Sequence, residues 1–305
     1  MRPDDWHLTE DLDDFLSHAG DFLRSRPAPH TVALTVTDAL RRRGPGLHGD
    51  EAPVFGWLAE PGGPVRAALF RTPPQPLNTT AVTAGEADAL AARLLGLGHT
   101  VTGVVAERET AAAFTAAWER RTGDRGTLGR RQRLYRLEDL AVPEPAPDGR
   151  ARVAGTADRE LLARWCEEFA DAVGQRGYQE PGAWADARIA NGGVTLWETP
   201  DRTAVAMAGA TPEVAGQVRV APVYTPAHLR GRGYAGAVTA EVSRVARDTG
   251  TEVLLFTDLA DPTSNGLYQR IGYRPVADFA EYRFGSAPRN QGHSRVRSQP
   301  NAVRR

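Results

Sequence analysis

The sequence predicts an α/β protein built from two similar halves that are joined by a short linker. Three observations carry this prediction. Helix-type and strand-type patterns alternate along the chain, their order in the first half returns in the second, and an irregular Pro-rich segment separates the halves. At 305 residues the chain is long for one compact domain. Two domains of about 140 residues are therefore the expected arrangement.

Apolar residues at helical spacing predict the helices, and short apolar runs bounded by Gly and Pro predict the strands. In the first half they predict helices over 9–24, 32–43, 86–95 and 109–121, and strands over 54–60, 65–71, 77–82, 100–106 and 132–137. In the second half they predict helices over 159–173, 181–191, 234–248 and 264–271, and strands over 194–198, 204–210, 217–225, 252–257 and 280–284. The two hairpins are similar, which favours a duplication. Two unrelated α/β domains with similar hairpins are the alternative.

The run from Val142 to Gly149 contains three prolines and is not expected to hold regular structure. It divides the chain into a first domain at 1–142, a linker at 143–150 and a second domain at 151–285. Residues 286–305 have little apolar content and several arginines, so we expect a disordered basic tail there.

Composition argues against several classes of protein. The formal net charge is −1, which favours neither nucleic acid nor an anionic membrane as a partner. No apolar run approaches the roughly 18–20 residues that span a bilayer, and the first residues lack the apolar segment of a signal peptide. The single cysteine, Cys166, fits a reducing compartment. We expect a cytoplasmic monomer or homodimer that binds neither nucleic acid nor membrane.

The segment from Arg230 to Gly236 carries the strongest chemical signal. It follows a predicted strand and opens a predicted helix, and its glycines let backbone N–H groups converge on an anion such as a pyrophosphate. A glycine-rich turn with two solvated arginines is the plain alternative. Gly231, Gly233 and Gly236 also match the dinucleotide fingerprint. That fingerprint normally begins a longer series of strands and helices than remains here before the tail.

Two motifs together resemble the GNAT superfamily of N-acetyltransferases. Arg230-Gly231-Arg232-Gly233-Tyr234-Ala235 is similar to its coenzyme A loop, R/Q-x-x-G-x-G/A, and the segment from Asp261 to Tyr273 is similar to its second signature, N-x-x-A-x-x-L-Y-x-x-x-G-F/Y. The resemblance covers 151–285. It implies an α/β fold of tandem GNAT-like domains. Each would be a mostly antiparallel, twisted sheet with a splayed central strand, flanked by helices.

The resemblance also implies an activity and a site. It implies transfer of an acetyl group from acetyl-CoA to a small-molecule or peptide amine, by direct attack on the thioester and without a metal. The backbone of Val223 and Thr225 would pair with the pantetheine arm, and the Val223 N–H would polarise the thioester carbonyl. Tyr268 would protonate the departing thiolate, with an ordinary core aromatic as the alternative. The loop residues that would bind the cofactor are Arg230, Gly231, Arg232, Gly233, Tyr234 and Ala235.

The sequence departs from the second signature at two positions. Asp261 stands where the family usually has Asn, and Ser264 stands where it often has Ala. Asp261 can still cap the following helix, and we expect Asn265 to bind the cofactor in place of the missing amide.

The general base is less clearly marked. Asp258, just past the strand over 252–257, ranks first. A water relay without a single base is an equal alternative. Other candidates for the base, each also readable as a solvated surface residue, are Glu213, Glu180 and His228. Candidates for acceptor specificity on the helices that usually wall the acceptor site are Glu167, Glu168 and Trp184.

The first half lacks a comparable loop. Thr80 to Gly85 offers one glycine and no arginine, so we expect this half to have lost coenzyme A binding and to help shape the substrate cleft. The basic cluster from Arg130 to Arg133 is expected on a solvated face or turn. Two other functions stay open: transfer of a longer acyl chain from its acyl-CoA, and a sensor module that binds acyl-CoA without turnover.

Overall fold

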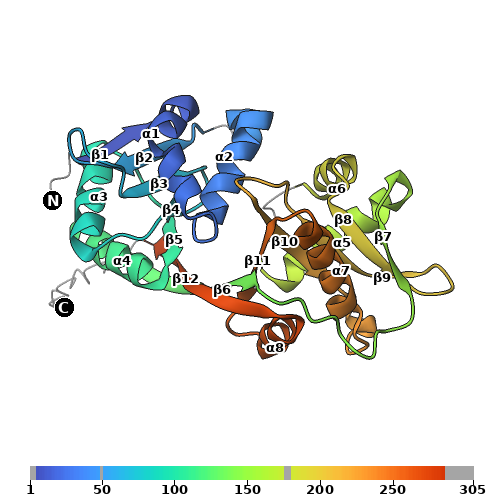
Figure 1. The fold of residues 1–305 in the computed structure, drawn as a ribbon. Helices are drawn as coiled ribbons and strands as arrows, with labels where there is room; N and C mark the ends of the chain where they lie inside the picture. The colour runs from blue at the N-terminus through green and yellow to red at the C-terminus, as the bar shows by residue number, and fades with distance from the viewer. Residues whose placement is uncertain (1–4, 49–50, 175–179, 286–305) are drawn as a thin grey trace, which may run out of the picture.

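The structure is a computed structural model that describes residues 5–48, 51–174 and 180–285. Its strands form one 12-stranded mixed sheet in the order β1-β2-β3-β4-β5-β12-β6-β11-β10-β9-β8-β7 (Figure 1). The elements of the first half are β1 (Trp6–Thr9), α1 (Leu12–Ser25), α2 (Thr31–Arg43), β2 (Val54–Leu58), β3 (Ala67–Arg71), β4 (Leu77–Thr79), α3 (Ala84–Gly96), β5 (Gly103–Glu107), α4 (Arg108–Thr122) and β6 (Arg125–Leu137).

The second half repeats this order of elements. They are β7 (Arg150–Val153), α5 (Arg159–Ala172), α6 (Pro181–Ala190), β8 (Val194–Glu198), β9 (Ala204–Ala210), β10 (Gln217–Tyr224), α7 (Tyr234–Asp248), β11 (Glu252–Asp258), α8 (Pro262–Ile271) and β12 (Tyr273–Gly285). Short 3-10 turns lie at Pro45–His48, Thr156–Asp158 and Ala227–Leu229. The mixed α/β fold that the sequence predicts is therefore confirmed, with each predicted helix and strand present.

The largest differences from the predicted strands are at four places. β1 and β7 were not predicted, and β6 and β12 are each 13 residues long, more than twice their predicted lengths. Both long strands alternate poorly between apolar and polar residues because charged side chains pair across them. Arg130 to Arg133 were predicted on a solvated face or in a turn. They do not form a turn, since they belong to β6, where Arg130 contacts Glu281 at 3.4 Å.

The two long strands exchange between the halves. β12, the last strand of the chain, lies between β5 and β6, whereas β6 lies between β12 and β11 (Figure 1). Each half thus completes its sheet with the terminal strand of the other half. The predicted domain limits at 142 and 151 remain a prediction, and neither half has a complete sheet of its own.

The helices cover the sheet in two layers. In the first half α3 and α4 pack on one face and α1 and α2 on the other; in the second half α7 and α8 pack on one face and α5 and α6 on the other. In Figure 1, α3, α4, α7 and α8 lie on one side of the continuous sheet. We call the opposite side, covered by α1, α2, α5 and α6, the α5/α6 face. Ala28, between α1 and α2, packs there on Leu134 and Leu254 of the central strands.

The Arg133–Asp278 ion pair ties β6 to β12 at the junction. The two side chains form two hydrogen bonds, of 2.6 and 2.9 Å, and they lie opposite each other in the strand pair. Hydrogen bonding to Arg133 lowers the pKa of Asp278 below its usual range, although burial acts in the opposite direction. The contribution of this carboxylate to stability is therefore present above its unfolded-state pKa of about 3.9 and is lost as the pH falls through its lower folded-state pKa.

We expect Asp278→Asn to lower the free energy of unfolding by about 1 kcal/mol at pH 7, because a charge-assisted pair is lost at a partly buried site. The difference from wild type should stay constant down to about pH 5 and shrink below about pH 4. Urea unfolding at several pH values measures it. Asp186→Asn is the matched control, since the Arg159–Asp186 pair has the same two-bond geometry on an exposed surface and should matter less. A difference in the free energy of unfolding that does not change with pH would contradict this account.

No helix within the described ranges is long and apolar enough to cross a membrane.

Candidate functional site

The central strands β10 and β11 separate partway along their length. They pair in parallel only from Gln217 to Arg219, which lies beside Leu254. Beyond this point β10 continues to pair with β9 on its other side, through a bulge between Val220 and Val223. On the side facing β11, the backbone past Arg219 has no strand partner within the described chain. This is the splayed strand that the resemblance implies, and Val223 lies in its open section.

The turn after β10 presents a row of free backbone donors. No described residue accepts a hydrogen bond from any backbone N–H between Gly231 and Gly236, and no side chain caps α7. Gly231 and Gly233 have φ values of +77° and +83°, which only glycine adopts without strain. The turn is exposed from Arg230 to Gly233. Free backbone donors at the positive end of a helix dipole are an arrangement suited to an anion such as a pyrophosphate.

The two arginines of the turn differ in their contacts. Arg230 folds back, and its Nε donates to the carbonyl of Thr225 at 3.1 Å. Arg232 is exposed and has no polar contact within the described part of the chain. The hydroxyl of Thr225 is buried and has no hydrogen-bond partner among the described residues, so it is available at the end of the splayed strand.

The equivalent helix of the first half, α3, is capped by its own side chains. The Thr83 hydroxyl accepts from the backbone N–H of Glu86 at 3.3 Å, and the Glu86 carboxylate accepts from the backbone N–H of Thr83 at 2.8 Å, so α3 has a complete capping box. A carboxylate therefore occupies the position where a pyrophosphate would bind at α7. This contrast supports the expectation that the first half does not bind coenzyme A.

Tyr268 lies on α8, on the face of the sheet that also carries α7. Its side chain is buried, and its ring meets that of Tyr273 edge-on, with centroids 6.1 Å apart. Burial raises the pKa of Tyr268 far above its usual range, and the charge of Asp261 adds to the effect. The hydroxyl has no hydrogen-bond partner among the described residues. Tyr268 therefore stays protonated, and its hydroxyl donates to no described residue.

The start of α8 accounts for the two departures from the second signature. Asp261 caps the helix as expected, since it accepts from the backbone N–H groups of Thr263 and Ser264 and from the Ser264 hydroxyl at 2.6 Å. Asn265 is committed elsewhere: its amide donates to the carbonyls of Asp258 and Asp261, both at 2.7 Å, and its Oδ1 accepts from Tyr135. Its predicted role in binding the cofactor would require these bonds to change.

Asp258 ends β11 on the opposite face from Tyr268. It lies four residues beyond Leu254, and Val223 lies four residues beyond Arg219, so both belong to the section where the two strands have separated. Strand alternation puts Asp258 with Leu254 on the α5/α6 face. Its Oδ1 accepts from the backbone N–H of Ala260 at 2.8 Å, which leaves the second oxygen free.

The α5/α6 face also carries a pair that sequence reasoning missed. The Tyr224 hydroxyl donates to Glu168 of α5 at 2.7 Å, and burial together with this carboxylate raises the pKa of Tyr224 to about 12. Glu168 was predicted as a specificity residue, but its partner lies 56 residues away in sequence, and no spacing rule relates the two. The pair brings a carboxylate beside the end of the splayed strand.

The other predicted candidates lie in structural roles or on the surface. Glu180 caps α6 by accepting from the backbone N–H groups of Ala183 and Gly182, which lowers its pKa. Glu213 is exposed and contacts Thr251, and His228 is exposed in a 3-10 turn. Glu167 is also exposed. Trp184 is buried under Arg188.

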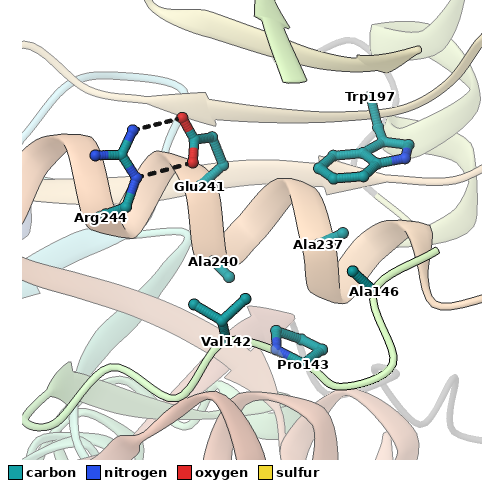
Figure 2. A pocket seen from close by; sticks show the side chains of 8 residues that line it. All are labelled: Val142, Pro143, Ala146, Trp197, Ala237, Ala240, Glu241 and Arg244. Atoms are coloured by element: carbon teal, nitrogen blue, oxygen red, sulfur yellow. Dashed lines mark hydrogen bonds and ion pairs between the residues drawn. The ribbon is translucent and has the colours of Figure 1, made fainter. Parts of the chain in front are cut away.

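The linker lies along α7 rather than away from the site. Val142, Pro143 and Ala146 line a shallow apolar pocket, with Trp197 of β8 and α7 on its other sides (Figure 2). The Glu241–Arg244 ion pair forms its charged end. None of the predicted site residues lines this pocket. The linker approaches the anion site more closely at Pro147, which lies beside Gly233.

The comparisons with known proteins agree with this geometry. Residues 207–284 match the family model described as FR47-like protein. A GCN5-related N-acetyltransferase from Sphaerobacter thermophilus superposes with a TM-score of 0.60 at 18% identity, covering 93% of this chain and 96% of that one. A GNAT-family acetyltransferase from Colwellia psychrerythraea gives 0.58 at 11% identity, with coverages of 92% and 99%.

A tandem GNAT protein from the clavulanic acid biosynthesis pathway gives a TM-score of 0.53 at 12% identity, covering 93% of this chain and 99% of that one. None of the curated proteins matches the sequence. The chain thus has the tandem GNAT fold, and the resemblance that its two motifs predict is confirmed. At identities of 11–18% these solved structures show a shared fold, and the family model matches the later part of the second half.

Proposed function

We propose that this chain, with its tandem GNAT fold, is an acetyl-CoA-dependent N-acetyltransferase that acts on an amine and has one active site, in its second half. The observation that carries the proposal is the uncapped start of α7, beside a splayed strand, where no described residue accepts from the backbone N–H groups of Gly231 to Gly236. The capped start of α3 in the first half supports a single site.

In this proposal the cofactor and the amine bind on opposite faces of the sheet. The cofactor binds over the face of α7 and α8, with its pyrophosphate at the Gly231–Gly236 turn, and the amine approaches from the α5/α6 face. The amine nitrogen forms a bond to the acyl carbon to give a tetrahedral intermediate, and the carbon–sulfur bond then breaks to release the thiolate. The Val223 N–H stabilises the charge on the carbonyl oxygen, the amine proton passes to Asp258, and Tyr268 gives its proton to the thiolate.

We expect Asp258→Asn to lower kcat/KM for the amine by about 100-fold, because general bases contribute about 10²–10⁴-fold. The asparagine carbonyl can still accept the bond from the Ala260 N–H, so the turn into α8 is preserved. The measurement is kcat/KM for the amine in both proteins at the same pH, with the affinity for acetyl-CoA measured alongside. An unchanged kcat/KM would favour the water relay instead.

The proposed function is tested by thiol release from acetyl-CoA in the presence of a panel of small-molecule and peptide amines. Acetylated product with one class of amine supports it. A competition between acetyl-CoA and longer acyl-CoA donors decides the chain length, and preference for a longer chain would replace acetyl by that acyl group. Binding without transfer to any amine would favour the sensor module.

The remaining assignments belong to the same proposal. We place the protein in the cytoplasm as a monomer or homodimer, with a small-molecule or peptide amine as its partner and with no metal, nucleic acid or membrane. The single cysteine supports a reducing compartment, and the near-zero net charge supports the expectation of neither nucleic acid nor an anionic membrane as partner.

A further inference from the structure

Two arginines that have no acidic partner among the described residues lie on the α5/α6 face, where the first half meets the second. Arg219, near the start of β10, donates to the hydroxyls of Thr31 and Thr35 of α2 at 3.2 and 3.3 Å. Arg188, on α6, donates to the carbonyl of Ala210. These neutral contacts use three of the ten N–H donors that two guanidinium groups carry.

The electrostatic environment of the pair is unfavourable as it stands. Burial lowers the pKa of Arg219 to about 10, and the charge of Arg188 adds to this effect. Burial also lowers the pKa of Arg188 to about 10; Cys166 acts in the opposite direction, and the charge of Arg43 adds a smaller lowering. No carboxylate in the described part of the chain forms an ion pair with Arg188 or Arg219. Elsewhere in this protein, partly buried arginines such as Arg133 and Arg152 do have carboxylate partners.

A buried amide adds an independent sign of a missing ligand. Gln217 has no exposed surface; its Oε1 accepts from Thr31 at 2.9 Å, and its Nε2 has no partner among the described residues. Gln217 and Arg219 lie two residues apart on the same face of β10, about 6.6 Å apart. Leaving a buried donor without a partner is destabilising, and such a group in a folded protein calls for an explanation.

We propose that Arg188, Arg219 and the Nε2 of Gln217 form a binding site for a small molecule bearing an oxyanion, a carboxylate or a phosphate. Guanidinium groups match the planar or tetrahedral array of oxygens on such anions, and the amide supplies a further donor. The anion would satisfy the buried donor and relieve the repulsion between the two arginines.

This site is separate from the proposed acyl-CoA site and does not depend on acyl transfer. Arg219 lies near the start of β10, whereas the turn that follows Thr225 lies beyond its other end, about 20 Å away along the strand. Since α2 contributes Thr31 and Thr35, the ligand would also bridge the two halves of the chain.

Thermal unfolding of the full-length protein tests the site, with inorganic phosphate, succinate and chloride compared at matched ionic strength. We expect phosphate or succinate to raise the melting temperature by about 2 °C or more over chloride, and the more effective of the two identifies the anion. Arg219→Gln and Arg188→Gln should each abolish the increase. Arg136→Gln, which removes the same charge from an exposed ion pair with Glu252, should retain it.

A structural role for the arginines predicts a different pattern. The variants would then unfold at a lower temperature by the same amount in every salt, and wild type would respond equally to all three anions; either result overturns the site. Should the arginine variants fail to fold, Gln217→Leu serves in their place. It removes the unpartnered amide, so the protein should fold at least as stably in chloride and respond less to the effective anion. An undiminished response in a folded Gln217→Leu protein would also count against the site.

Discussion

A Gly233→Glu variant is expected to bind acetyl-CoA about 100-fold or more weakly than wild type. Gly233 is the residue before α7 and has a left-handed backbone with φ +83°. A glutamate there puts a negative charge beside the free N–H groups that would bind the pyrophosphate. Losing two hydrogen bonds to a charged group costs about 3 kcal/mol or more, which corresponds to about 100-fold in affinity. Calorimetric titration with acetyl-CoA measures the change.

The control for this prediction must separate backbone strain from loss of the site. Gly98 offers it, because it has nearly the same conformation, φ +78°, and is exposed with no atom near its Cβ position. Gly98→Glu should carry the same strain, about 1–2 kcal/mol of stability, and bind acetyl-CoA like wild type. Equal affinities in the Gly233→Glu protein and in wild type would show that the turn does not hold the cofactor.

Tyr268→Phe is expected to lower kcat by about 10²–10³-fold while leaving the affinity for acetyl-CoA nearly unchanged. The hydroxyl has no structural partner in the described chain, so its removal breaks no hydrogen bond, and the buried ring remains in place. The substitution removes the hydroxyl group that we assign as the proton donor to the departing thiolate. Steady-state rates of thiol release, together with the affinity for acetyl-CoA, separate the two effects.

Tyr273→Phe is the matched control. Its ring contacts that of Tyr268, but its hydroxyl shares a 2.7 Å hydrogen bond with Ser243. This variant should lose about 1 kcal/mol of stability and keep its kcat. If both variants keep full activity, Tyr268 is an ordinary core aromatic, which was the alternative for this residue.

Local signals in the sequence predicted most of the fold. The strands over 194–198 and 204–210 and the helix over 234–248 have the predicted limits, because each has a clear periodicity and a turn at both ends. β6 and β12 were predicted too short, since their charged residues pair with each other across the junction. That pairing, like the exchange of terminal strands between the halves, is a property of the folded chain.

In the candidate site, too, local signals predict some features and the folded structure determines the others. Free N–H groups at Gly231 to Gly236 follow from glycine spacing, which the sequence displays directly. The opposite faces of Tyr268 and Asp258, and the contact of Tyr224 with Glu168, depend on how distant elements pack. Asn265 illustrates the limit most clearly. Its residue type suits a cofactor contact, but its amide is already bonded to two carbonyls that only the fold brings near.

The measurement that tests the central claim most directly is a calorimetric titration of the wild-type protein with acetyl-CoA, with NADH titrated in parallel. The account predicts micromolar affinity for acetyl-CoA, about −8 kcal/mol, with one site per chain and no response to NADH. Two sites per chain would contradict the closed start of α3. Binding of NADH alone, or of neither compound, would contradict the assignment of the Gly231–Gly236 turn to an acyl-CoA.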